Sequence, residues 1–157
     1  MKKISAGQIR KLREKTGAPM LRVKKVLEGT KGDEKRAERI LKKEGYEKAS
    51  KRAGRVTSQG LIETYVHHSG KVASVVELLS ETDFVARNKL FRELVHNLAL
   101  QVASMNPKDA KELEKQEFIK DPKKKIGDLV KDVIVKTGEN IRIGRIYRIE
   151  LGQPTKS

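Results

Sequence analysis

The sequence predicts an α+β protein in which a helical N-terminal module precedes one small core, a mainly antiparallel sheet with helices on one face. Apolar residues recur every three to four positions up to about residue 48 and alternate singly in three later runs. A basic stretch without apolar periodicity separates the two patterns, and 157 residues suffice for one modest core. We therefore predict a three-helix module over 1–48, a basic linker or helical extension over 49–60, and an α+β core over 61–157.

Three short helices are predicted in the N-terminal module, over residues 5–17, 19–29 and 33–45. Ser5 and Gln8 have the spacing of a capping box, Pro19 suits a first helical turn, and Asp33 suits an N-cap. A glycine follows or ends each helix. The residues at helical spacing, expected to face inward, are Ile9, Leu12, Thr16, Met20, Val23, Leu27, Ala37, Ile40 and Leu41.

The core region changes to strand periodicity. Residues 61–67 and 72–79 alternate and are rich in β-branched residues, as expected for a hairpin that turns at 68–71. Apolar spacing predicts a long helix over 91–105, ended by Asn106-Pro107, and a second helix from Ile126 to Gly138. Alternation over 141–151 predicts a third strand. Charged residues dominate 108–125, where no element is predicted.

Charge and composition narrow the classes of function. The net charge is +15, and residues 1–60 alone hold 19 basic and 7 acidic side chains, so we expect a negatively charged partner. The sequence has no cysteine and no apolar run long enough to span a membrane, and the basic first residues are followed by polar ones and not by an apolar signal segment. These observations favour a cytoplasmic protein over a membrane or secreted one. We find no phosphate-binding loop, zinc motif or nucleophile elbow, and therefore expect no cofactor and no covalent catalysis.

The segment Glu81–Asn88, ETDFVARN, interrupts the alternation just before the long predicted helix. Taken alone, it favours a structural role, in which Thr82 or Asp83 caps a helix and Phe84 fills the core. The same eight residues closely resemble the signature of the bacterial elongation factor Ts family. Two further stretches resemble the family in the same order along the chain, namely Leu12–Ala18 followed by Met20 and Lys24-Lys25, and Gly138–Ile141.

The resemblance implies a function and a set of site residues. Members of the family are guanine-nucleotide exchange factors that act on elongation factor Tu, and their N-terminal module is a three-helix bundle of the ubiquitin-associated type. By matching motif, Asp83 and Phe84 would form a wedge that enters the partner's G domain. A second contact would come from the N-terminal module, through Arg13, Met20, Leu21 and Lys24. Gly138 would either touch the partner or simply cap a helix, and a glycine there is explained by the cap.

This chain departs from the family pattern in several places, among them Thr137 and Gly144 beside the Gly138–Ile141 stretch. Pro19–Val23 stands where members often carry Gly-Met-Met-Asp-Cys, and only a short charged stretch joins Asn106-Pro107 to Phe118, where longer members insert further structure. The chain thus resembles the short members of the family, which have one core half. Short members pair as homodimers, so the resemblance also implies a homodimer.

Two hypotheses from other classes stay open at the level of sequence. The basic N-terminal part, with Lys51, Arg52 and Arg55 in the linker, is compatible with binding nucleic acid. Aromatic residues are only 4% of the chain and none lies among the linker's basic residues, so stacking platforms for bases are missing and no specific nucleic acid is expected. A structural or dimerising domain without exchange activity is the third hypothesis.

His67 and His68 are adjacent on a predicted strand and should point to opposite faces, so we expect no metal site.

Overall fold

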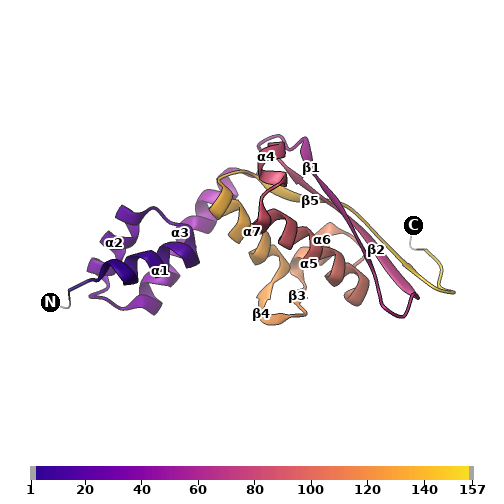
Figure 1. The fold of residues 1–157 in the computed structure, drawn as a ribbon, viewed down its shortest axis with the longest axis horizontal. Coiled ribbons are helices and arrows are strands. Elements are labelled where there is room, and N and C mark those ends of the chain that lie inside the picture. The colour runs from indigo at the N-terminus through magenta and orange to yellow at the C-terminus, as the bar shows by residue number, and fades with distance from the viewer. Residues whose placement is uncertain (1–2, 156–157) are drawn as a thin grey trace.

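The protein is described by a computed structural model that covers residues 3–155, and its shape is elongated (Figure 1). Three helices lie at one end, and a second group of helices packed on a twisted sheet lies at the other. The elements in order are α1 (Ala6–Thr16), α2 (Met20–Gly29), α3 (Glu34–Lys51), β1 (Gln59–Val66), β2 (Val72–Ser80), α4 (Asp83–Ala86), α5 (Lys89–Met105), α6 (Ala110–Lys115), β3 (Glu117–Phe118), β4 (Asp121–Lys125), α7 (Ile126–Thr137) and β5 (Ile141–Glu150).

The N-terminal helices form a bundle with its own small core. The Ser5–Gln8 capping box is present, and Gly17 ends α1 with a φ of 68°, as the sequence predicted. Met20 is the exception among the predicted inward residues, because 55% of it is exposed. It is the first residue of α2, and the first buried residue of that helix is Val23, about one turn further on. The buried residues of this bundle are Leu12, Val23, Val26, Leu27, Ala37 and Leu41.

The third helix is longer than predicted, since α3 continues past Gly45 to Lys51. A Cβ atom at Gly45 would lie 3.2 Å from both Cγ atoms of Val135 on α7. The glycine therefore permits close helix packing and does not end the helix. The last turns of α3 also contact the core, where Tyr46 donates a hydrogen bond to Asp132 at 2.7 Å and Ala49 is buried. The helix thus runs through the predicted boundary at 48, and the division into domains stays a prediction.

The second part of the chain confirms the predicted α+β class. Its sheet has the order β1-β2-β5 with both pairs antiparallel, so that Thr64, Val75 and Tyr147 lie in one row across it. Helices α5 and α7 lie on one side of this sheet (Figure 1). Residues of the sheet and both helices share one core, whose fully buried side chains include Val76, Leu78, Phe91, Val95, Leu98, Leu113 and Ile126.

Between α5 and α7 lie three elements that the sequence analysis did not predict: α6 and the short hairpin of β3 and β4. A buried glutamine holds this hairpin. The amide nitrogen Nε2 of Gln101 donates to the carbonyl of Glu117 at 3.0 Å, and its Oε1 accepts from the backbone N–H of Ile119 at 3.0 Å. Gln101 is 0% exposed, and these bonds satisfy its polar atoms inside the core.

Within residues 3–155, no helix combines the length and the apolar character that crossing a membrane requires.

Candidate functional site

The ETDFVARN segment forms an exposed turn at one end of the core. It follows the end of β2 and contains the four-residue helix α4, whose N-cap is Thr82: the Thr82 hydroxyl accepts a hydrogen bond from the N–H of Val85 at 3.3 Å. Val85 and Ala86 are 5% and 4% exposed and anchor the turn in the core. Phe84 faces the other way and is 81% exposed. The interpretation that Phe84 fills the core is therefore wrong, whereas the capping role of Thr82 is confirmed.

Asp83 lies beside the exposed ring and carries an ion pair. Its Oδ2 lies 2.6 Å from Nη2 of Arg87, one helical turn further on, and both side chains are largely exposed. Exposed pairs of this kind contribute little to stability, about 0–1 kcal/mol. The pair instead holds a carboxylate and a guanidinium in defined positions next to Phe84.

The segment that follows α7 contacts the same turn across 57 residues of sequence. Both carboxylate oxygens of Glu139 accept hydrogen bonds from Thr82, one from its backbone N–H at 3.0 Å and one from its hydroxyl at 2.7 Å. The carboxylate of Glu81 accepts from the backbone N–H of Asn140 at 2.7 Å and lies 3.5 Å from Nη1 of Arg55. Two of the three stretches that suggested a family resemblance, ETDFVARN and Gly138–Ile141, are thus one structural unit.

Asn140 connects this unit to the basic linker. Its amide nitrogen donates to the carbonyls of Ala53 at 3.3 Å and Arg55 at 2.9 Å, and the residue is only 3% exposed. Gly138 precedes it and ends α7 with a φ of 77°, donating its N–H to the carbonyl of Ile134 at 2.9 Å. The helix cap fully explains this glycine, and a contact between Gly138 and a partner stays a prediction.

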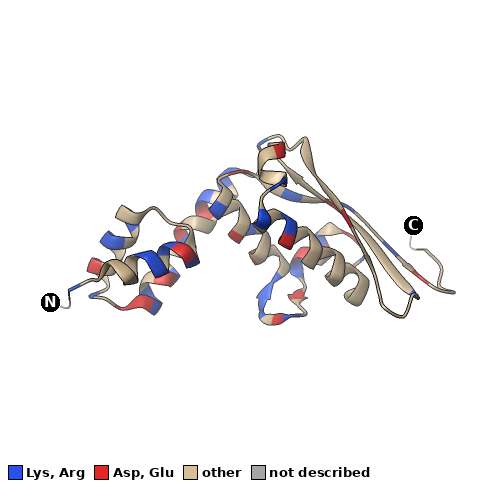
Figure 2. Cartoon of the chain, in the orientation of Figure 1, with Lys and Arg blue, Asp and Glu red and all other residues tan. Residues whose placement is uncertain are grey.

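The other predicted contact residues lie on the N-terminal bundle, apart from α4 (Figure 1). Leu21 is 84% exposed and Met20 55% exposed, so the start of α2 presents two large apolar side chains. Arg13 on α1 is also exposed, and Lys24 lies 4.0 Å from Glu28. Lys and Arg residues are frequent along these helices (Figure 2). The structure therefore places the predicted contacts in two separate regions.

A bidentate ion pair holds the start of α2 against α3. Arg22 donates from Nε to Glu44 at 2.9 Å and pairs with it a second time through Nη2. The hydrogen bonds from Arg22 hold the pKa of the Glu44 carboxyl below its ordinary value, and they raise the pKa of the guanidinium. The pair fixes the backbone next to the exposed Met20 and Leu21.

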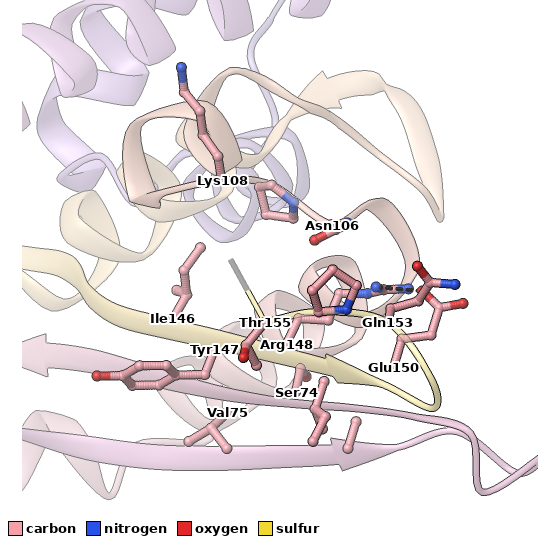
Figure 3. Close-up of a pocket in the computed structure, with 14 residues that line it drawn as sticks. Ser74, Val75, Asn106, Lys108, Ile146, Tyr147, Arg148, Glu150, Gln153 and Thr155 are labelled. Atoms are coloured by element: carbon pink, nitrogen blue, oxygen red, sulfur yellow. Dashed lines mark hydrogen bonds and ion pairs between the residues drawn. The ribbon is translucent and has the colours of Figure 1, made fainter. Parts of the chain in front are cut away.

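A hollow of about 440 Å³ lies at the far end of β5 (Figure 3). Two of the polar side chains that line it serve the fold: the Ser74 hydroxyl donates to the carbonyl of Ala99 at 2.6 Å, and Nε of Arg148 donates to the carbonyl of Ala103 at 2.9 Å. Arg148 also pairs with Glu150 at 2.8 Å. These bonds give Ser74, Arg148 and Glu150 structural roles.

Among residues 3–155, no group of three or more His, Cys, Asp or Glu side chains is arranged to hold a metal ion. The prediction that His67 and His68 point to opposite faces is wrong, because their ring centroids are 4.1 Å apart. Strand β1 ends at Val66, so the two histidines lie in the turn, where side chains no longer alternate. Nδ1 of His67 is hydrogen-bonded to the Ser69 hydroxyl at 2.7 Å.

Comparison with known proteins identifies the family. The family model described as Elongation factor TS matches residues 81–156, beginning at the first residue of the exposed turn. Elongation factor Ts of Oleidesulfovibrio alaskensis is 39% identical over 97% of this chain and 100% of its own length. The chain belongs to the elongation factor Ts family. Elongation factor Ts of Thermotoga neapolitana and of Thermotoga maritima are each 40% identical over 96% of the chain, covering 98% and 97% of their own lengths.

The alignment with the Oleidesulfovibrio elongation factor Ts extends over 197 positions, more than the 157 residues present here. That relative therefore carries residues without a counterpart in this chain, which agrees with the expectation of a short form. Membership of the family also makes this protein an elongation factor of protein biosynthesis.

Sequence reasoning missed the residues that hold the exposed turn. Glu139 and Glu81 carry no local signal for this role, because their partners are 57 and 59 residues away. Arg87 was part of the recognised motif and has the i, i+4 spacing to Asp83 that favours an ion pair, so its contact could have been anticipated.

Proposed function

We propose that this protein binds elongation factor Tu in its GDP state, promotes release of GDP and Mg²⁺, and stabilises the nucleotide-free protein until GTP binds. The observation that carries the proposal is Phe84, an aromatic side chain that is 81% exposed on a turn anchored by buried neighbours. Exposed aromatic rings of this kind are typical hot spots of protein interfaces. No covalent step is involved, so the protein acts as an exchange factor and not as an enzyme in the bond-making sense.

Exchange of this kind is a coupling between two binding equilibria. A factor that prefers the nucleotide-free partner lowers the affinity for GDP by the same ratio by which GDP lowers the affinity for the factor. A protein that bound both states equally would accelerate nothing. Phe84 supplies the required difference if its ring fits only a partner whose Mg²⁺ region has opened, with Asp83 as the polar group that acts on the same part of the partner.

The N-terminal bundle provides the second contact in this proposal. Met20 and Leu21 form an exposed apolar tip at the start of α2, and the same bundle carries the exposed basic residues Arg13 and Lys24. Basic residues around an apolar tip favour rapid association with an acidic surface on the partner. We interpret the bundle as a module of the ubiquitin-associated type that binds the G domain of elongation factor Tu, which would place the protein in the cytoplasm.

A homodimer is also part of the proposal, supported by the face of the sheet opposite α5 and α7. Five large side chains on this face are at least 36% exposed: Ile62, Val66, Val75, Tyr147 and Ile149. Contiguous apolar surface on a sheet commonly marks an interface. A second copy could pack on it through the same residues, as two-fold symmetry requires. Light scattering should then give twice the monomer mass, and Tyr147→Lys should give the monomer mass.

The decisive experiment measures release of a fluorescent GDP from elongation factor Tu by stopped flow, with and without this protein, at low and at moderate salt. Acceleration at both salt concentrations supports the exchange function. An RNA-binding protein would instead show strongly salt-dependent affinity for RNA and no effect on GDP release. A folded protein that leaves GDP release unchanged refutes the proposal.

A further inference from the structure

We infer that Glu139 is a positioning residue for nucleotide exchange, whose carboxylate fixes the turn that presents Phe84. The inference rests on the proposed exchange function. It gives the segment after α7, Gly138–Ile141, a role in exchange, and this role does not require the segment to contact the partner. It is carried by the hydrogen bonds that join this segment to the exposed turn.

The geometry makes Glu139 more than a neighbour of the turn. The Thr82 hydroxyl accepts a bond from the N–H of Val85 and donates its own proton to Oε2 of Glu139 at 2.7 Å. The second oxygen, Oε1, accepts the backbone N–H of Thr82 at 3.0 Å. One carboxylate therefore sets both the backbone of the N-cap and the direction of its hydroxyl, and this hydroxyl caps the helix that carries Phe84.

A four-residue helix needs such support. Helix α4 is far too short to be stable by itself, so its orientation depends on its cap and its buried residues. Val85 and Ala86 hold one side of it in the core, while Phe84 and Asp83 extend into solvent. Without Glu139 the buried side remains in place, but the N-cap loses both bonds that fix the angle at which the aromatic ring leaves the surface.

The position of Phe84 should affect the rate of GDP release more than the stability of the fold. An interface residue that must enter a pocket loses affinity when it is disordered in the free protein, because its ordering must then occur on binding. The bonds of Glu139 are largely exposed, so their loss should cost the fold little. We expect Glu139→Ala to slow GDP release by about tenfold, while the protein stays folded.

The test combines exchange kinetics with ¹⁹F NMR of the free protein labelled with fluorophenylalanine. The chain has three phenylalanines, and two of them, Phe91 and Phe118, are 0% and 7% exposed, so Phe84 gives the one solvent-exposed signal. In Glu139→Ala, the Phe84 signal should shift and narrow, while the two buried signals stay. The matched control is Glu117→Ala, which removes an exposed carboxylate of the same charge.

Thr82 provides a second pair of variants, in case Glu139→Ala does not fold. Thr82→Ser keeps both the N–H and the hydroxyl and should retain the wild-type exchange rate. Thr82→Val removes the hydroxyl and should not retain the wild-type exchange rate. If Glu139→Ala lowers the melting temperature but leaves exchange and the Phe84 signal unchanged, Glu139 is only structural and the inference is overturned. The NMR measurement needs no partner and tests only whether Glu139 positions Phe84. A wild-type protein without exchange activity would therefore refute the proposed function, whatever the NMR result for Glu139→Ala.

Discussion

Replacing Phe84 by alanine separates the exchange mechanism from the fold. Aromatic side chains bury about 150–250 Å² when fully enclosed. With 81% of Phe84 exposed, the fold covers about a fifth of this area, worth about 1 kcal/mol at 25 cal/mol per Å². Phe84→Ala should therefore remain folded, with a free energy of unfolding within about 1 kcal/mol of wild type.

The effect on the partner should be much larger. The remaining four fifths of the ring are available for burial in a pocket, and truncated hot-spot residues typically cost about 2–4 kcal/mol. At 1.4 kcal/mol for each factor of ten, Phe84→Ala should reduce the acceleration of GDP release by about 30-fold to 1000-fold.

The assay is stopped-flow release of fluorescent GDP at several factor concentrations, with urea unfolding of the same protein. Leu21→Ala is a matched control, because Leu21 is about equally exposed, at 84%, but belongs to the proposed N-terminal contact. It should weaken binding at low factor concentration and leave the rate at saturation near wild type. Full exchange activity of a folded Phe84→Ala protein would refute the wedge mechanism, and a protein that unfolds would show that the ring stabilises the fold.

Three further perturbations test other parts of the structure. Asp83→Ala should weaken exchange less than Phe84→Ala, by about 3-fold to 10-fold in the same stopped-flow assay, since it removes one exposed polar group. Hydrogen bonds from Arg145, including one from Nη2 at 2.9 Å, hold the pKa of the Glu77 carboxyl below its ordinary value. The ionised Glu77 therefore stabilises the fold above pH 4.5, and this contribution is lost as the pH falls through the lower pKa of the folded state. Urea unfolding between pH 7 and 3 should therefore show a smaller acid loss for Glu77→Gln than for wild type. Tyr46→Phe removes the donor to Asp132 and should cost about 1 kcal/mol in urea unfolding at pH 7.

Elements with local signals were predictable from the sequence. The Ser5–Gln8 capping box, the left-handed glycines at the ends of α1 and α7, and the alternation in the strands each act within a few residues. Such signals specify where an element begins or ends without knowledge of the rest of the fold. The α+β class followed from them, because the apolar face of an antiparallel sheet must be covered and the amphipathic helices can cover it.

The features that escaped prediction depend on distant contacts. Gly45 has the sequence appearance of a helix end, and only the neighbouring Val135 explains why it lies inside one. The hairpin of β3 and β4 depends on the buried Gln101, whose partners are 16 and 18 residues away. Likewise, the exposure of Phe84 follows from the burial of Val85 and Ala86, which a four-residue helix cannot reveal through periodicity.

The two predicted contact regions are joined by a continuous path of packed elements. Helix α3 runs without a break from the bundle to the core and packs on α7, and α7 leads directly into Glu139 beside the exposed turn. A flexible tether between the regions would only raise the local concentration of Phe84 near the partner. A packed connection also sets its direction, so in the proposed mechanism binding by the N-terminal bundle would direct the ring toward its pocket on the partner. The packing of α3 on α7, which Gly45 permits, therefore links the two proposed contact surfaces.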